Sequence, residues 1–390
     1  MKKVAMIGSI HEDGWKILEE ENCEVFEIND FSKKNLIEQL SDVDGIALRT
    51  AKLDEEILRE CPKLQIVARH GVGYDNVDLN YLNQNKQALA ITGTANAVSV
   101  AEHVMTMFLC LAKQIYKSDN FVRSGKFTKK NELPNFFELY KKNILILGFG
   151  RIGQALAITG TSNAVSVAEH VMTMFLCLVK QINKSDNFVK SGKFTEKNEL
   201  PDFFELYKKN VLIMGFGRIG QSLAHRCLGF EANIYIYDPF VDQQAIENKN
   251  CLKIGFDEGL SIADFISIHI PLNNDTNKLI SKDQFLLMKK ECILVNTARG
   301  GIIDEEALAW ALKNNKIYGA GLDVFETEPP STNNPLLELD NVLLTPHNAA
   351  LTLECRKRMA VETCQNILYY LNDHAKLNKN NIVNRKELNL

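Results

Sequence analysis

Short apolar runs alternate with amphipathic stretches along the first ninety residues of the chain. The apolar runs predict strands at Lys3–Ile7, Glu24–Ile28, Gly45–Leu48, Gln65–Ala68 and Leu89–Thr92. Strands that alternate with helical segments are typical of a parallel sheet whose faces are covered by helices. The N-terminal part of the chain therefore predicts an open-sheet α/β domain.

The same alternation returns in the second half of the chain. The apolar runs predict strands at Asn210–Met214, Ala232–Tyr237, Leu252–Ile254, Phe265–Ile270, Cys292–Asn296, Tyr318–Leu322 and Asn341–Leu344. Helical patterns occur at Gln221–Gly229, Phe285–Met288, Glu305–Lys313 and Leu353–Leu371. We therefore expect an α/β protein with two doubly wound, Rossmann-like domains.

Between these two regions the sequence repeats itself. Residues 90–156 recur almost unchanged at residues 157–223, at an offset of 67, and nine positions differ. A solenoid would need more copies and flanking members of the same series. We interpret the repeat as an internal 67-residue duplication, and we call residues 90–156 the first copy and residues 157–223 the second copy.

Only one copy can occupy a given place in the fold. Residues 90–140 continue directly from the last strand of the N-terminal domain, so the first copy is expected to form the hinge between the domains. The surplus is then expected at about residues 141–210. In that position it would expose apolar side chains such as Phe175 and Leu176, with a risk of aggregation.

Composition and charge narrow the classes of function. Hydrophobic residues make up 45% of the chain and charged residues 24%, as in an ordinary globular protein. The formal net charge of −4 leaves no broad basic field, so nucleic acid is not expected as a partner. The chain shows neither a run of about 18 apolar residues nor a signal peptide, so no membrane and a cytoplasmic location are expected. The nine cysteines form no CxxC pair and no cluster has the spacing of metal ligands, so no metal is expected.

Two glycine-rich motifs with the sequence GFGRIG stand at Gly148–Gly153 and Gly215–Gly220. A dinucleotide site needs a strand, a glycine turn, a helix, a second strand and an acidic residue about 20 positions further on. The second motif has all of these, with Asp238 as the acidic residue, whereas the helix after the first motif is broken within a few residues. The second motif is therefore expected to bind the cofactor.

Each glycine of the second motif has a physical task. Gly215 permits the sharp bend, Gly217 lets a pyrophosphate approach the backbone, and Gly220 allows the helix to pack closely on the strand. The phosphates would meet free amides at the positive end of a helix. Asp238 would accept hydrogen bonds from the ribose hydroxyls and repel a 2′-phosphate, so NAD is expected rather than NADP.

Three polar side chains form a candidate catalytic set. Reduction of a 2-keto acid needs a cation for the carboxylate, an acid for the forming alkoxide, and a carboxylate that orients the acid. Arg299, Glu328 and His347 are of these types, and each follows a predicted strand. Because α/β proteins bind ligands at the carboxyl edge of the sheet, we expect the three to meet there. Glu326 is an alternative to Glu328.

These motifs resemble the D-isomer-specific 2-hydroxyacid dehydrogenase family, along nearly the whole chain apart from one duplicated copy. The resemblance implies that Arg299 holds the substrate carboxylate, that His347 is the acid/base, and that Glu328 pairs with His347. It also implies cofactor contacts by Arg218, Ile219, Thr297, Ala298 and Asp323, with Asp323 at the nicotinamide carboxamide.

The segment Ala68–Asp78 resembles the substrate loop of the same family. This implies that the amides of Val72 and Gly73 bind the substrate carboxylate, and Arg49 is a candidate for a more distal substrate contact. The three histidines His70, His103 and His170 are interpreted as structural rather than catalytic.

The resemblance also implies a domain arrangement. Residues 1–95 and 348–390 would form a discontinuous substrate domain, and residues 96–347 would form the NAD-binding domain, which contains the duplicated segment. A homodimer is expected.

The expected function is that of an NAD-dependent oxidoreductase, which transfers a hydride between NAD(H) and a small D-2-hydroxy acid or 2-keto acid. The leading substrate is 3-phosphoglycerate, and the alternative is a glycerate dehydrogenase that reduces hydroxypyruvate or glyoxylate. A rival from another class is a catalytically silent NAD-sensing protein. The intact set of Arg299, Glu328 and His347 disfavours that rival.

Overall fold

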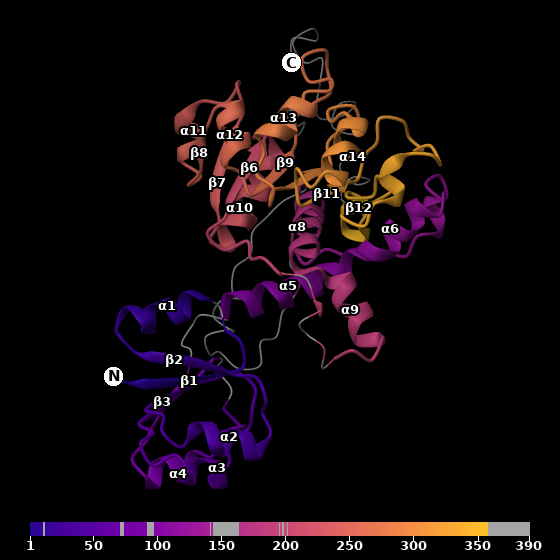
Figure 1. The fold of residues 1–390 in the computed structure, drawn as a ribbon. Coiled ribbons are helices and arrows are strands. Elements are labelled where there is room, and N and C mark those ends of the chain that lie inside the picture. Colours follow the sequence, from indigo (N-terminus) through magenta and orange to yellow (C-terminus); the bar gives the residue numbers. More distant parts are fainter. Residues whose placement is uncertain are drawn as a thin grey trace. The chain divides into compact units, whose positions relative to one another are not determined.

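The computed structural model describes residues 1–10, 12–70, 74–91, 97–140, 142, 164–194, 196, 199–200 and 202–357. The chain forms two compact units, residues 1–100 and residues 101–390 (Figure 1). Each unit is built on a parallel β-sheet.

Five strands form the sheet of the first unit, in the order β2-β1-β3-β4-β5. They are β1 (Lys3–Ile7), β2 (Glu24–Ile28), β3 (Gly45–Leu48), β4 (Ile66–Arg69) and β5 (Ala88–Ile91). The helices between them are α1 (Glu12–Glu20), α2 (Lys33–Leu40), α3 (Glu55–Arg59) and α4 (Leu79–Gln84). Asp54 and Asp78 begin α3 and α4, because each carboxylate accepts a hydrogen bond from a first-turn amide. This strand order is that of a flavodoxin-like open sheet.

Seven strands form the sheet of the second unit, in the order β12-β11-β10-β9-β6-β7-β8. They are β6 (Asn210–Met214), β7 (Asn233–Tyr237), β8 (Leu252–Lys253), β9 (Phe265–Ile268), β10 (Ile293–Asn296), β11 (Gly319–Leu322) and β12 (Val342–Leu344). The chain winds outward from β6 to β8 and then returns to the other side of β6 as β9. The strand order therefore reverses between β6 and β9, where open α/β sheets bind their ligands.

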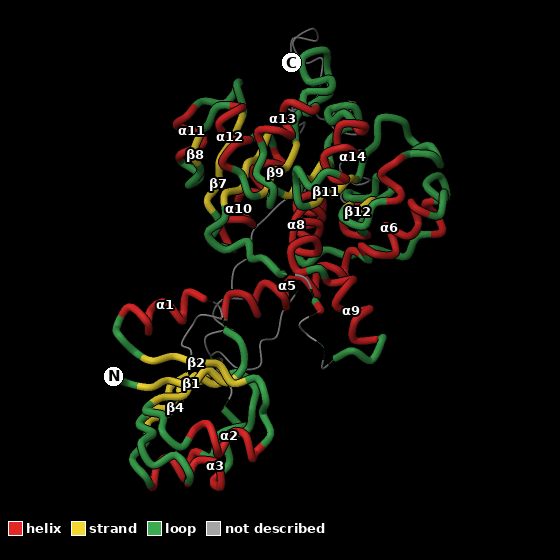
Figure 2. Tube along the Cα trace, viewed as in Figure 1, coloured by secondary structure: helices red, strands yellow, loops and turns green. Residues whose placement is uncertain are grey.

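Helices cover both faces of this second sheet (Figure 2). Alternate residues of β6 point to opposite faces, with Val211 in one core and Leu212 in the other. The first core contains α8 (Val165–Lys180) and α10 (Arg218–Gly229), and the second contains α12 (Phe256–Ile262), α13 (Lys282–Leu287) and α14 (Glu305–Lys313). The other helices of this unit are α5 (Ala97–Lys113), α6 (Ile115–Arg123), η1 (Lys130–Glu132), α9 (Ile182–Lys190), α11 (Gln243–Glu247) and η3 (Pro335–Glu338). The expected α/β fold, with Rossmann-like winding around β6, is confirmed.

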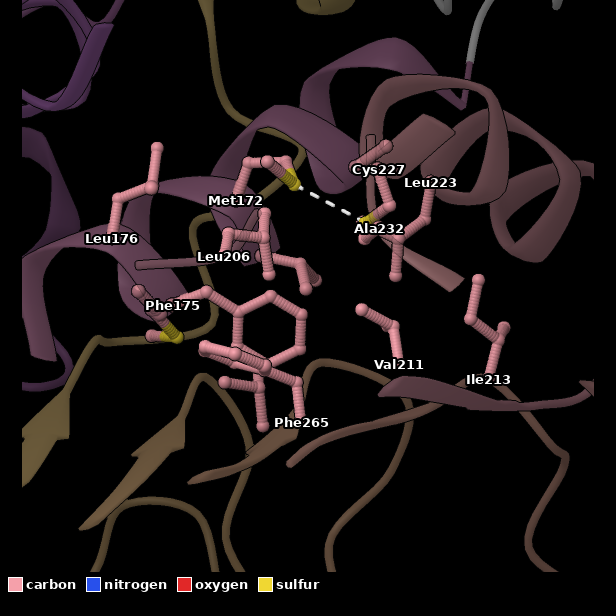
Figure 3. Close-up of a cluster of buried hydrophobic side chains, with 14 of the residues drawn as sticks. Met172, Phe175, Leu176, Leu206, Val211, Ile213, Leu223, Cys227, Ala232 and Phe265 are labelled. Carbon is pink, nitrogen blue, oxygen red and sulfur yellow. Dashed lines mark hydrogen bonds between the residues drawn. The ribbon is translucent and has the colours of Figure 1, made fainter. Parts of the chain in front are cut away.

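The second copy, rather than the first, supplies the core helix of the second unit. Phe175 and Leu176 on α8 are 0% exposed, and the ring of Phe175 meets that of Phe265 edge to face at 5.0 Å (Figure 3). The counterpart of Phe175 in the first copy, Phe108, is 38% exposed. The expectation that Phe175 and Leu176 would lie in an exposed surplus is therefore wrong.

The glycines of β11 allow α8 to lie directly on the sheet. A Cβ atom on Gly321 would lie 2.7 Å from Met174 Sδ, and one on Gly319 would lie 3.3 Å from a methyl carbon of Leu178. Such a close approach requires residues without a side chain on the strand. On the other side of α8, Cys227 Sγ of α10 lies 3.5 Å from Met172 Sδ, as Figure 3 shows. The place of the expected surplus is thus filled by a packed helix.

Among the described residues, no single helix is long and apolar enough to cross a membrane. Two consecutive pairs reach that length and hydropathy only jointly, Val98–Lys113 with Ile115–Arg123 and Val165–Lys180 with Ile182–Lys190. Their helices are bent by 53° and 52° at the break.

Candidate active site

The second glycine motif forms a tight turn between β6 and α10. Gly215 has a φ of +97°, and a Cβ atom there would lie 2.7 Å from the carbonyl oxygen of His269. A Cβ atom on Gly220 would lie 2.1 Å from the carbonyl oxygen of Gly215. Both positions therefore require glycine, one for its dihedral angle and close neighbour, the other for the packing of helix on turn.

Gly217 differs from the other two glycines of the turn. It is exposed and begins α10, and a Cβ atom there would meet no described heavy atom within 4 Å. No side chain caps the first turn of α10 within the described residues. Free amides beside an open space at a helix N-terminus make a suitable place for a phosphate group.

Asp238 lies next to this turn. It follows β7, and its Oδ2 accepts a hydrogen bond of 2.8 Å from the backbone N–H of Phe216 inside the glycine turn. Its Oδ1 accepts a second bond of 2.9 Å from the N–H of Phe240. These two bonds hold the carboxylate at the ends of β6 and β7, where a dinucleotide ribose would lie.

A buried hydroxyl at the same edge of the sheet is placed to bind a ligand. Thr297 directly follows β10, and its Oγ1 is buried with no hydrogen-bond partner in the described part of the chain. Burying a hydroxyl without a partner is unfavourable, so a bound group is expected to supply one. The neighbouring Ala298 is half-buried, and its N–H donates to Asn296. Together with the open space at Gly217, these groups fit a dinucleotide.

The candidate catalytic residues follow three adjacent strands. β10, β11 and β12 are parallel neighbours, and their last residues, Asn296, Leu322 and Leu344, are paired in register. The three candidates, Arg299, Glu328 and His347, come three, six and three residues after these positions. All three therefore leave the sheet at its carboxyl edge.

Two of these side chains are in direct contact. His347 Nδ1 lies 3.0 Å from Glu328 Oε2, and both side chains are partly exposed. Glu328 is held in turn by the N–H of Phe325, which donates to Oε1 at 3.3 Å. The competing carboxylate, Glu326, instead accepts a hydrogen bond from the N–H of Glu305. Glu328 is thus the carboxylate that orients the histidine ring.

The backbone and the third side chain complete this edge. His347 has a φ of 51°, a left-handed conformation that non-glycine residues rarely adopt and that occurs often at functional sites. Arg299 is exposed, and its Nη1 donates 2.6 Å to the carbonyl oxygen of Ala298. Within the described part of the chain, the other four guanidinium N–H groups have no acceptor, which suits an anionic ligand.

Asp323 lies behind this edge in a buried network. Its Oδ1 accepts hydrogen bonds from the hydroxyl of Thr345 at 2.6 Å and from the N–H of Asn348 at 2.8 Å, and Oδ2 accepts one from the N–H of Ala349. Burial raises the pKa of Asp323 to about 6. The side chain is 1% exposed. Its hydrogen bonds to Asn348 and Ala349 hold the loop that carries His347, at the carboxyl edge of the sheet.

The network includes a residue whose place the sequence did not reveal. His170 on α8 is buried, and its Nε2 lies 3.0 Å from Thr345 Oγ1. Because the hydroxyl of Thr345 donates its single hydrogen to Asp323, its oxygen accepts a hydrogen bond from the Nε2–H of His170. Burial lowers the pKa of His170 to about 3, so the ring is neutral and its 3.9 Å approach to Asp323 is not an ion pair. The equivalent His103 carries the same sequence signal, so only the structure distinguishes them.

The remaining expected site residues are placed as follows. Arg218 is exposed and Ile219 is half-buried in the first turn of α10. Arg49 is exposed in the first unit, and its Nη1 donates to the carbonyl oxygen of Ser9. Val72 and Gly73 lie outside the described residues, and so does the first glycine motif at Gly148–Gly153. Among the described residues, no group of three or more His, Cys, Asp or Glu side chains could hold a metal ion.

The described part of the C-terminal segment contacts the second unit. The N–H groups of Asn348 and Ala349 donate to Asp323, and Thr352 Oγ1 donates to Glu138. Residues 358–390 lie outside the described residues. The expected assignment of 348–390 to a discontinuous substrate domain therefore stays a prediction.

Comparison with known proteins identifies a family. The model of the D-isomer specific 2-hydroxyacid dehydrogenase NAD binding domain matches residues 105–170 and 172–349. A glyoxylate reductase of Pyrococcus furiosus is 32% identical, over 94% of this chain and 92% of that protein. A D-3-phosphoglycerate dehydrogenase of Archaeoglobus fulgidus is 30% identical over 94% of this chain. The chain spans 56% of the length of that second relative.

A solved structure supports the fold of this family. A structure described as the pyruvate reductase of Chlamydomonas reinhardtii has a TM-score of 0.50 and 21% identity, and the match covers 96% of this chain and 97% of that one.

Proposed function

Because this chain belongs to the D-isomer specific 2-hydroxyacid dehydrogenase family, we propose that it is an NAD-dependent oxidoreductase acting on a small D-2-hydroxy acid or 2-keto acid. The observation that carries the proposal is the 3.0 Å contact between His347 and Glu328, at the sheet edge that also presents Arg299. An acid/base oriented by a carboxylate, an exposed cation and a dinucleotide turn at the same edge of the sheet form the set that keto-acid reduction needs.

The roles divide among the three side chains. Arg299 would bind the substrate carboxylate and orient the carbonyl, since a guanidinium can form a bidentate pair with a carboxylate. His347 would donate a proton from Nε2 to the carbonyl oxygen during reduction and accept it again during oxidation. Glu328 holds Nδ1, which leaves Nε2 directed away from the pair as the atom that exchanges the proton.

Bound NAD would supply the hydride or accept it. The chain would hold its pyrophosphate on the amides that follow Gly215 and Gly217, with the first turn of α10 through Arg218, Ile219 and Gly220. Asp238 would bind the ribose, and Thr297, Ala298 and Asp323 would line the nicotinamide end. The hydroxyl of Thr297, which has no partner among the described residues, would gain one there.

Two acids are candidate substrates, 3-phosphoglycerate and glycerate. Relatives are named both D-3-phosphoglycerate dehydrogenase and glyoxylate reductase. We propose 3-phosphoglycerate first and glycerate, with hydroxypyruvate or glyoxylate reduction, second. Val72 and Gly73 would bind the carboxylate, and Arg49 would contact a distal group, where a phosphate would need positive charge.

A panel of keto acids tests both the activity and its substrate. NADH oxidation would be followed with 3-phosphohydroxypyruvate, hydroxypyruvate, glyoxylate and pyruvate, and we expect turnover with at least one of the first three. His347→Asn should lower kcat about 100- to 10,000-fold, as expected for loss of a general acid. Arg299→Ala should lower kcat/KM about 10- to 100-fold through loss of a charged contact to the substrate.

The controls separate loss of chemistry from loss of fold. His225, an exposed histidine on α10, is the matched position for His347→Asn, and His225→Asn should leave kcat unchanged. Binding of NADH without turnover of any keto acid would instead support a cofactor-sensing protein. Failure to bind NADH at all would reject the cofactor site as well.

A further inference from the structure

The contacts between the two copies are reciprocal. Lys180 Nζ of the second copy lies 2.9 Å from Glu102 Oε2 of the first copy. Lys113 Nζ of the first copy lies 3.5 Å from Glu169 Oε2 of the second copy. Glu169 and Lys180 stand 67 positions after Glu102 and Lys113, so exchanging the copies turns one ion pair into the other.

The same two glutamates make reciprocal backbone contacts. Glu102 Oε1 accepts hydrogen bonds of 2.9 Å from the N–H groups of residues 206–207 in the second copy. The carboxylate of Glu169 accepts bonds of 3.1 Å from the N–H groups of residues 139–140 in the first copy. These two backbone segments are again equivalent, at the same offset of 67. The reciprocal contacts thus include the helices and also the backbone segments at residues 139–140 and 206–207.

Residues at the centre of the contact meet their own equivalents. Cys110 Sγ lies 2.7 Å from Cys177 Sγ. The hydroxyl oxygen of Tyr116 accepts a hydrogen bond of 3.1 Å from the N–H of Asn183, which occupies the equivalent position in the second copy. A residue can touch its own equivalent only on or near a two-fold axis, so the axis that relates α5 to α8 passes close to these pairs.

The contact is an interior one. The side chains of Glu102, Lys113, Glu169 and Lys180 are all buried. Leu109 and Ile115 of the first copy are likewise buried, and they belong to the same core as α8. Buried charges are stable only when they are paired, and each helix supplies a charged partner to the other, with Arg226 as a second cation 3.7 Å from Glu169.

The reciprocity ends beyond these helices. Asp119 of α6 accepts a hydrogen bond from the N–H of Leu344 on β12, and Arg123 donates to the carbonyl oxygens of Leu337 and Val342. In Figure 1, α6 lies beside β12, whereas its counterpart α9 lies apart from the sheet and has no buried residue. The single sheet of this unit offers one β12 edge, and the first copy occupies it.

We propose that α5 and α8 form, within one chain, the self-complementary two-fold interface that would otherwise join two copies of this chain. Contacts in which each side presents the same residues to the other are isologous and are characteristic of identical subunits. Here both sides belong to one polypeptide, and the first copy takes the position of a second subunit. The chain is therefore a monomer in solution, in place of the homodimer expected from the sequence.

Tethering explains why the internal pairing prevails. Two segments of one chain that bind each other have an effective concentration on the order of millimolar when the linking sequence can span their sites. A second chain at micromolar concentration would have to displace α5 from α8 and α6 from β12. It would gain the same contacts in exchange, so it has no compensating advantage.

Sedimentation of the full chain tests this inference directly. We expect the mass of one chain throughout the micromolar range, with no dependence on concentration. A particle of two chains would overturn the proposal. NADH oxidation does not enter this measurement, so the outcome is independent of whether the proposed activity is correct.

Thiol oxidation tests which surfaces meet. Diamide takes up two electrons and two protons from a pair of neighbouring thiols, which become a disulfide while the azo group becomes a hydrazine. We expect a link between Cys110 and Cys177 in a species that runs as one chain on a non-reducing gel. Cys110→Ser should abolish it, whereas Cys227→Ser, a change at another buried thiol outside this pair, should not. A covalent dimer joined through two Cys110 or two Cys177 residues, or no link at all, would contradict the proposal.

Charge exchange gives a second comparison that does not depend on thiol chemistry. With internal pairing, Glu102→Lys destabilises the chain, and adding Lys180→Glu restores part of the lost Tm. Adding Lys113→Glu instead should lower the Tm further, because it breaks the other ion pair. In a dimer built from two α5 helices, Lys113 would face Glu102, and the order of the two double variants would be reversed.

Discussion

Phe175→Ala and Phe108→Ala form a matched pair, because the two copies place the same residue in different surroundings. Phe175 is fully buried against Phe265, whereas Phe108 is 38% exposed on α5. Truncating a fully buried phenylalanine removes its transfer free energy and leaves a cavity, at a cost of about 3–5 kcal/mol. Truncating the half-exposed copy should cost within about 1 kcal/mol.

The measurement must report on the second unit alone. The chain has two tryptophans, Trp15 on α1 of the first unit and Trp310 on α14 of the second. In a Trp15→Phe background, tryptophan fluorescence during urea unfolding therefore follows the second unit. The free energy of unfolding would be compared for Phe175→Ala and Phe108→Ala in that background.

We expect Phe175→Ala to lower the free energy of unfolding by at least about 2 kcal/mol more than Phe108→Ala does. Equal losses would mean that both copies contribute equally to cores in solution. A larger loss for Phe108→Ala would mean that the first copy is the core helix. Either result would refute the assignment of α8 to the sheet.

Three further predictions concern the site and its support. Gly220→Ala should lower the free energy of unfolding of the second unit by about 3 kcal/mol, because its Cβ would lie 2.1 Å from a carbonyl oxygen. Gly217→Ala should leave that free energy within about 0.5 kcal/mol of wild type and weaken only NADH binding, which calorimetry would measure. Asp238→Ala should raise the KM for NADH about tenfold or more and the KM for NADPH less, and equal effects in steady-state kinetics would reject its role at the ribose. His170 has a folded pKa of about 3, so the unfolded chain takes up a proton near pH 6.5 that the folded chain does not, and stability falls as the pH drops. His170→Gln should therefore reduce the loss of stability between about pH 7 and about pH 5 by about 2 kcal/mol in urea titrations, and an unchanged loss would show that the ring is not buried and neutral.

The strands were the most predictable part of the fold. Buried parallel strands are short apolar runs bounded by polar residues, and β1, β2, β3 and β6 have the expected bounds. Other strands differ by one or two residues at their ends, such as β9, which ends at Ile268 rather than Ile270. The positions of Arg299, Glu328 and His347 after strands followed directly from this pattern, because parallel strands end at one edge.

The choice between the copies could not be predicted in the same way. The first helices of the two copies differ only at Ala112 and Val179, which are both apolar, so patterning assigns both helices to a core. The distinction depends on long-range contacts, such as the approach of Met174 to Gly321 of β11. For the same reason His170 could not be told from His103, although of these two histidines it is His170 that lies within hydrogen-bond distance of Thr345. Local sequence does not determine which of two nearly identical segments packs on the sheet.

The nature of the duplicated segment explains why the fold accepts it. Lengthening a connection is inexpensive, since each doubling of a loop costs only about 0.6 kcal/mol in closure entropy. What limits a large insertion is the apolar surface and the buried charge that it brings. A segment that makes a self-complementary contact supplies the partner for its own copy, so Glu102 and Lys113 are satisfied by Lys180 and Glu169. Acceptance of the repeated segment therefore follows from the contacts that its two copies make with each other, and not from its length.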